Sequence, residues 1–224
     1  MVKKILIGLV VIVGGFLAYA ATRPDTYHVE RATKIEAPAP VVFAQLEDFK
    51  AWPAWSPWDK LDPAMKKMYD GPPSGVGSSY SWQGNDKVGK GKVTITESQP
   101  PTRIGYRLEF MEPFSAVATT SFMLKPEGDK GVGITWAMDG TNNLIGKVFG
   151  IFMNMDQSIG GDFEKGLAAL KTTSEAEAKK QAEAAAKAQA EAAAAEAAKA
   201  KEAAVAAAPE PEPAKKGKGK GKKH

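Results

Sequence analysis

The spacing of hydrophobic residues changes twice along the chain, and each section predicts a different kind of structure. Residues 5–21 form an uninterrupted apolar stretch without a charged side chain. Residues 26–171 contain short runs with a two-residue apolar period and longer runs with a period of three to four. Beyond residue 174 the apolar residues are almost all alanine. We therefore expect a membrane-type helix, one folded domain and a non-globular extension.

The apolar stretch 5–21 predicts a helix of roughly 25 Å, at the short end of what crosses a bilayer. Lys3 and Lys4 precede it, which predicts a cytoplasmic N-terminus and a single-pass anchor, residues 1–23, in a bacterial inner membrane. The rest would face the periplasm or the cell exterior. Ala18-Tyr19-Ala20 also fits a signal-peptide cleavage site, so a removed secretion signal is the alternative. The length of the apolar stretch favours the anchor.

Alternating apolar and polar positions predict strands in the middle of the chain. The runs are 26–35, 75–82, 87–97, 103–110, 116–125 and 131–138, with Gly, Asn and Pro between them. The alternation is clearest in Ile104, Tyr106 and Leu108 and again in Ile134 and Trp136. It is typical of an antiparallel sheet with one covered face.

Helical periodicity appears on both sides of these strands. A short helix is expected after Pro40, followed by a tryptophan-rich loop or single turn at 49–58. A long amphipathic helix is expected from Asn142 or Asn143 to about Lys171. Its apolar stripe consists of Leu144, Val148, Phe152, Met155, Ile159, Phe163, Leu167 and Leu170. Gly160-Gly161 should bend or weaken it. These elements predict an α+β domain, residues 24–173, whose sheet wraps around the helix.

The extension divides into two parts. Residues 174–208 contain twenty alanines among thirty-five residues, with Glu and Lys, which predicts a solvated helical spacer. Residues 209–224 form a Pro/Lys/Gly tail that we expect to be disordered, with six lysines from Lys215 to His224. Two interpretations of this tail stay open. It either attracts an anionic envelope polymer or lipid headgroups, or it is a solubilising tail without a partner.

Composition narrows the chemistry available to the domain. The chain has no cysteine and two histidines, which argues against thiolate zinc sites and most metal or triad chemistry. The net charge of +4 resides in the two ends, because residues 22–173 hold 17 basic and 18 acidic side chains. A specific nucleic-acid partner is therefore not expected. The glycine pairs lack the spacing of nucleotide-binding loops, so no cofactor is assigned. No catalytic residue or metal ligand is assigned either.

Several short motifs resemble one protein family. They are Val29-Glu30-Arg31, Ile35-Glu36-Ala37-Pro38, Val42-Phe43, Trp52-Pro53, Trp55-Ser56-Pro57-Trp58, Tyr69-Asp70-Gly71-Pro72, Gly75-Val76-Gly77, Trp82-Gln83-Gly84-Asn85 and Phe163-Glu164-Lys165-Gly166-Leu167. Together with the order of elements, they resemble the START-like superfamily called SRPBCC, in particular its polyketide cyclase/dehydrase-like members. The resemblance covers roughly residues 26–173. It implies a helix-grip fold, in which a curved antiparallel sheet surrounds a long C-terminal helix and encloses an apolar cavity.

Aromatic and methionine side chains on the sheet and the long helix are the candidates for lining such a cavity. The predicted ligand-binding residues are Trp82, Tyr106, Phe110, Trp136, Phe152 and Met155. For each of them the alternative is ordinary core packing, because large apolar side chains usually fill the interior.

Three hypotheses for function follow. The first is a membrane-anchored domain that binds a lipid-like or other hydrophobic small molecule in the cell envelope. The second is an enzyme of the polyketide cyclase/dehydrase type, which the family resemblance implies. The third is a structural envelope adaptor whose tail contacts an anionic polymer. Because the helix-grip fold supports many activities, the fold alone does not choose between them.

Overall fold

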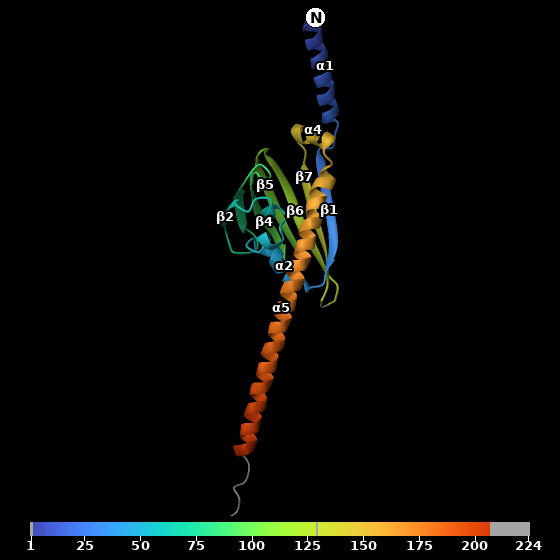
Figure 1. Ribbon diagram of the computed structural model, residues 1–224. Helices are drawn as coiled ribbons and strands as arrows, with labels where there is room; N and C mark the ends of the chain where they lie inside the picture. The colour runs from blue at the N-terminus through green and yellow to red at the C-terminus, as the bar shows by residue number, and fades with distance from the viewer. Residues whose placement is uncertain (1, 129, 207–224) are drawn as a thin grey trace, which may run out of the picture. The chain divides into compact units, whose positions relative to one another are not determined.

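The computed structural model describes residues 2–128 and 130–206, and a curved seven-stranded antiparallel sheet is its central feature (Figure 1). The described residues up to Lys179 form one compact unit, and residues 180–206 belong to a second one. The predicted tail 209–224 lies outside the described residues. The α+β class and the helix-grip architecture expected from the sequence are confirmed.

The elements follow one another in the order that the hydrophobic pattern predicts, with one additional strand. They are α1 (Val2–Ala21), β1 (Thr26–Ile35), α2 (Ala39–Glu47), α3 (Trp52–Trp55), η1 (Trp58–Lys60), β2 (Lys66–Asp70), β3 (Ser79–Gln83), β4 (Lys90–Gln99), β5 (Arg103–Glu112), β6 (Ala116–Pro126), β7 (Val132–Thr141), α4 (Leu144–Phe152) and α5 (Met155–Ala206).

The strands lie in the order β1-β7-β6-β5-β4-β3-β2. Consecutive strands from β2 to β7 pair as a meander, and β1 joins the free edge of β7 with Arg31 opposite Trp136. The edge strand β2 was not expected, because its residues KKMYD show no apolar alternation. Pairing with β3, with Tyr69 opposite Tyr80, makes it a strand.

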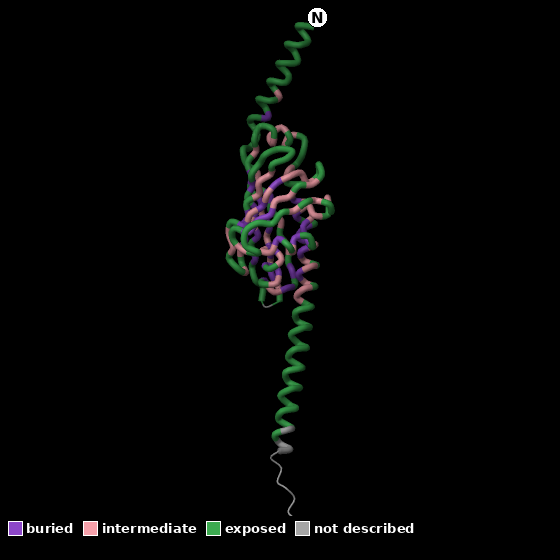
Figure 2. The backbone as a smooth tube through the Cα atoms, turned by 90° about the vertical axis from the view of Figure 1, so that its left-hand side faces the viewer, coloured by how far each residue is buried: buried purple, intermediate pink, exposed green. Residues whose placement is uncertain are grey.

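Aromatic rings fill the space between the sheet and the helices. Trp136 of β7 stacks on Phe163 of α5, with ring centroids 3.9 Å apart and planes at 6°. Trp55 and Phe122 pack against the same indole. Figure 2 shows the buried segments gathered in the middle of the domain. Burial of these large side chains stabilises the fold by roughly 1.5–3 kcal/mol each.

Ion pairs fasten the start of α5 to the sheet. Arg31 of β1 bonds Asp156 at 2.9 Å and Glu164 at 2.8 Å. Gly160 lies under the guanidinium, where a Cβ atom would come within 2.1 Å of the Arg31 Nη2 atom. Helix α5 runs through Gly160 and Gly161 without interruption. Gly160 instead makes room for the arginine.

The expected single helix from Asn143 to Lys171 is divided into α4 and α5, which corrects the sequence prediction. Asn143 caps α4 by accepting a hydrogen bond from the Gly146 amide at 2.8 Å. The helix ends at Phe152, and Asn154 then accepts a bond from the Gln157 amide at 3.1 Å at the start of α5. Apolar spacing does not reveal this break, because Phe152 and Met155 continue the three-to-four period across it.

Helix α5 continues from the domain into the predicted spacer without interruption. Ser174 is fully buried, and Ala178 packs against the hydrophobic core. The Glu175 carboxylate accepts a hydrogen bond from the Glu36 amide at 2.9 Å. The predicted boundary at residue 173 therefore falls within a helical segment that contacts the sheet domain.

We predict that two truncations differ in stability. A chain ending at Lys179 should melt at the temperature of the full chain. A chain ending at Thr173 should melt a few degrees lower, because losing the Glu36–Glu175 bond and the packing of Ala178 costs about 1–2 kcal/mol. Thermal unfolding in the same detergent, followed by circular dichroism, compares them. Equal melting temperatures for both truncations would show that residues 174–178 contribute nothing.

Candidate functional site

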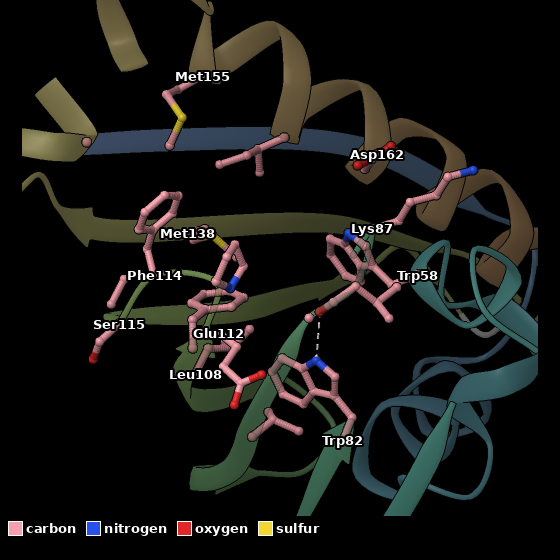
Figure 3. Close-up of a pocket in the computed structure, with 18 of the residues that line it drawn as sticks. Trp58, Trp82, Lys87, Leu108, Glu112, Phe114, Ser115, Met138, Met155 and Asp162 are labelled. Atoms are coloured by element: carbon pink, nitrogen blue, oxygen red, sulfur yellow. Dashed lines mark hydrogen bonds between the residues drawn. The ribbon is translucent and has the colours of Figure 1, made fainter. Parts of the chain in front are cut away.

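A cavity of about 440 Å³ lies between the sheet and the helices α4 and α5 (Figure 3). Most of its wall is apolar or aromatic. The larger apolar lining residues are Tyr27, Trp52, Trp58, Met65, Tyr80, Trp82, Val88, Val93, Leu108, Phe110, Phe114, Met138, Ile145, Phe149, Met155 and Ile159. Such a volume and lining are typical of sites for small apolar molecules.

The cavity occupies one end of the concave face, and the packed core occupies the other. Along β5 the buried Tyr106 belongs to the core, whereas Leu108 and Phe110 line the cavity. Helix α5 divides in the same way, because Met155 and Ile159 line the cavity and Phe163 packs in the core. The inward-facing residues of β5 therefore belong to the core at one end of the strand and to the cavity wall at the other.

Small residues leave room at the cavity end. The inward positions of β6 pass from Phe122 and Leu124 at the core end to Ala118 and Ala116 at the cavity end. On the neighbouring strands, the Trp82 ring lies over Gly91, where a Cβ would come within 2.5 Å of the indole.

Trp82 is held in a fixed orientation by two further contacts. Its indole nitrogen donates a hydrogen bond to the Val88 carbonyl at 3.0 Å, drawn as a dashed line in Figure 3. The ring also meets Phe110 edge to face, with centroids 6.0 Å apart. The polar edge of the indole is therefore satisfied within the protein, and its apolar surface contributes to the cavity wall.

Two phenylalanines border the mouth of the cavity. Phe114, in the β5–β6 connection, and Phe149 of α4 meet with ring centroids 5.7 Å apart. Their exposed fractions are 49% and 46%, so each ring has one face toward solvent. Apart from Asp59, the charged residues that line the cavity are Asp86, Lys87, Glu112 and Asp162.

One buried carboxylate stands out in the apolar wall. Asp59 of η1 is paired through Oδ1 with the Lys67 ammonium, and their side chains are 10% and 13% exposed. Among the described residues no donor reaches the buried Asp59 Oδ2 atom. The Lys67 Nζ atom lies 5.4 Å from the centroid of the Tyr80 ring. Burial lowers the pKa of Lys67 and raises that of Tyr80.

The structure brings three of the six predicted ligand-binding residues together. Trp82, Phe110 and Met155 line the cavity from β3, β5 and α5. Phe152 lies elsewhere, on α4, where it is 74% exposed and contacts Phe16 of α1.

The other two predicted residues, Tyr106 and Trp136, are buried in the core and do not line the cavity. The Tyr106 hydroxyl donates to the Leu46 carbonyl at 3.0 Å, and the Trp136 indole donates to the Thr120 hydroxyl at 2.8 Å. These bonds satisfy their polar atoms inside the protein. Both side chains therefore lie in the core, as the alternative of ordinary core packing expects.

Sequence reasoning missed several residues of the wall. Leu108 and Met138 share the alternation of their strands with predicted residues, so the two-residue period could have found them. Trp58 is the last residue of the segment expected to be a loop or a single turn, Asp59 follows it, and no periodicity points to either residue. Their place depends on how η1 folds back over the sheet.

Several polar side chains of the sheet lie outside the cavity. Arg107 and Glu109 pair at 3.4 Å, and both are partly exposed. His28 pairs with Asp139 at 2.8 Å on the surface, and this hydrogen bond raises the pKa of the imidazole. In the part of the chain that the structure describes, no group of three His, Cys, Asp or Glu residues is arranged to hold a metal ion.

Comparisons with known proteins agree with this architecture. A family model described as polyketide cyclase/dehydrase and lipid transport matches residues 26–175. No curated protein sequence matches the chain.

Solved structures share the fold at low sequence identity. A hypothetical protein of Helicobacter pylori is similar with a TM-score of 0.52 and 10% identity, over 66% of this chain and 88% of that one. A protein of Thermobifida fusca reaches 0.50 and 19%, over 66% and 92%.

We predict that the Asp59–Lys67 pair is costly to break and cheap to replace. Asp59→Ala should lower the free energy of unfolding by about 3 kcal/mol, because it leaves the Lys67 ammonium largely buried without its carboxylate. The double variant Asp59→Leu with Lys67→Met should recover most of this loss. Denaturant unfolding of the three chains measures both effects. Equal losses in the single and double variants would contradict the account of this pair.

Proposed function

Because the chain belongs to the polyketide cyclase/dehydrase and lipid transport family, we propose that it is a membrane-anchored domain that binds one hydrophobic small molecule or lipid in its cavity. The observation that carries the proposal is the apolar space between β5, β7 and α5, which the packed core does not fill. The family is associated with hydrophobic ligands, and a cavity of about 440 Å³ has the size of a ligand site.

The expected binding energy supports this function. Each methylene group moved from water into an apolar wall gains about 0.8 kcal/mol. A ligand that buries ten such groups therefore gains about 8 kcal/mol, from which the cost of association is subtracted. Leu108, Met138 and Met155 supply flexible or aliphatic walls that adapt to a chain-like molecule.

The buried carboxylate of Asp59 specifies the polar end of the ligand. Oδ2 accepts no hydrogen bond from the described residues and is closed to solvent, so a small rotation of the Asp59 side chain toward the cavity would let it accept one from a ligand hydroxyl or amine. A ligand carboxylate cannot donate to Oδ2 and would place a second negative charge beside it, on the side of Asp59 away from the oxygen that pairs with Lys67. We therefore infer an amphiphile with a hydrogen-bond donor near Asp59 and an apolar body toward Phe110 and Met155.

Membrane attachment is the second part of the proposal. Among the described helices, α1 alone has the length and composition to cross a membrane, features that a signal sequence shares. Lys3 and Lys4 at its start favour a cytoplasmic N-terminus, with the cavity on the periplasmic or outer side of a bacterial inner membrane. The mass of the mature N-terminus distinguishes an anchor from a cleaved signal.

No specific observation favours the enzyme or the adaptor hypothesis, so we do not propose them.

Filling the cavity should abolish ligand access. The test places the full chain in nanodiscs with a long-chain alcohol that carries a photoreactive diazirine. After illumination, peptide mapping locates the labelled positions. We expect labels on peptides that contain Leu108 and Phe110. Met155→Trp should remove most of this labelling, because the larger side chain fills the space between α5 and the sheet.

The matched control is Met123→Trp, the same substitution at an exposed site on the outer face of β6. It should leave cavity labelling unchanged, while labelling of α1 reports the reagent dissolved in the bilayer. Labels confined to α1 in the unmodified chain would refute a ligand-binding cavity. Equal loss in both tryptophan variants would show that the effect is not local to the cavity.

The headgroup preference gives a separate prediction. The alcohol should label the cavity several-fold more than a fatty acid of the same length, because Asp59 accepts from the hydroxyl and repels the carboxylate. In Asp59→Asn the difference should shrink, since the amide carries no charge. Competition between the two probes measures the ratio, with circular dichroism as the control for folding. A preference for the acid in the unmodified chain would contradict the role given to Asp59.

A further inference from the structure

Helix α4 presents an apolar surface that the domain does not cover. None of its nine residues, LIGKVFGIF, is buried. Its large side chains Leu144, Ile145, Phe149 and Phe152 are 46–74% exposed, and Met153 follows at 51%. A soluble helix normally turns its apolar residues toward the core, so this arrangement indicates a partner surface outside the domain.

The β5–β6 connection extends the same surface. Phe114 is 49% exposed, and its ring packs on Phe149 of α4. Both residues also line the mouth of the cavity, together with Ile145. We call α4 and Phe114 together the α4 face.

Several contacts fix the α4 face beside the end of α1. The Phe152 ring lies 6.0 Å from that of Phe16. The Lys147 ammonium donates to the Ala21 carbonyl at 3.1 Å and pairs with Asp25 at 2.5 Å. Asn142, just before α4, donates to the Pro24 carbonyl at 3.2 Å. The apolar surface of α4 therefore begins where the apolar helix α1 ends (Figure 1).

We propose that the α4 face docks on the bilayer that α1 crosses, so that the cavity opens onto the lipid surface. This inference rests on the membrane anchor in the proposed function. The bilayer is the occupant that the contacts favour, because a helix fixed to the last turn of a membrane span lies at the height of the headgroups. Aromatic and aliphatic side chains at such a site enter the boundary between headgroups and acyl chains.

The consequence concerns the route of the ligand. Phe114 and Phe149 at the mouth would lie against the lipid, and Met155 and Ile159 continue the apolar wall inward. A lipid could then enter from the leaflet without exposing its apolar part to water. The ligand inferred above would accordingly be a molecule dissolved in that membrane.

Single cysteines can test this docking, because the chain has no native cysteine. The substitutions Ile145→Cys and Phe114→Cys report on the α4 face, and Leu144→Cys serves as a second variant if one of them misfolds. Val10→Cys reports on α1, and Met68→Cys, 73% exposed on β2, is the aqueous control. Each full-length variant is labelled with the environment-sensitive dye NBD. It is then placed in vesicles of phosphatidylethanolamine and phosphatidylglycerol, with and without spin-labelled lipid.

The proposal predicts blue-shifted emission that spin-labelled lipid quenches at positions 10, 114 and 145, and aqueous emission at position 68. Aqueous emission at 114 and 145 with a quenched position 10 would overturn the docking and leave the anchor intact. Aqueous emission at all positions would overturn both. A blue shift at 114 and 145 that spin-labelled lipid does not quench would show that protein, and not lipid, covers the α4 face.

Discussion

The stack of Trp136 on Phe163 is the contact on which the rest of the domain depends. It joins the centre of β7 to α5 at 3.9 Å, and Trp55, Trp58 and Phe122 surround the same indole. A curved sheet has one concave face, and a single helix cannot fill it along its whole length. By fixing where α5 contacts the sheet, the stack decides which part of that face becomes packed core.

The cavity follows from this division. On one side of the stack, Leu167 and Leu170 of α5 complete the core. On the other side α5 offers Met155 and Ile159, β6 offers the small Ala116, and the space between them stays unfilled. Arg31, bonded to Asp156 and Glu164, holds this end of α5 in place. The domain therefore keeps a rigid core and an apolar cavity on one sheet, as a binding function requires.

The sequence predicted the parts of this arrangement that depend on local periodicity. The strand at 26–35, the alternation of apolar and polar residues in β5 and β7, and the apolar stripe of α5 all follow from spacing. It did not predict β2, whose strand geometry comes from pairing with β3, or the break at Met153-Asn154, where the apolar period continues. Nor could alternation show that Tyr106 lies in the core while Phe110, four residues along the same face, lines the cavity. That difference depends on where α5 crosses, a tertiary property.

The central claim is that the cavity holds one apolar molecule. Native mass spectrometry of the full chain, purified from membranes and released from its micelle in the gas phase, tests it most directly. We predict a population heavier than the bare chain by the mass of one amphiphile, which organic extraction and fragmentation then identify as a molecule with a hydroxyl or amine. The account would be contradicted if the chain appeared in its folded charge states without a bound molecule, both as purified and after incubation with a membrane lipid extract.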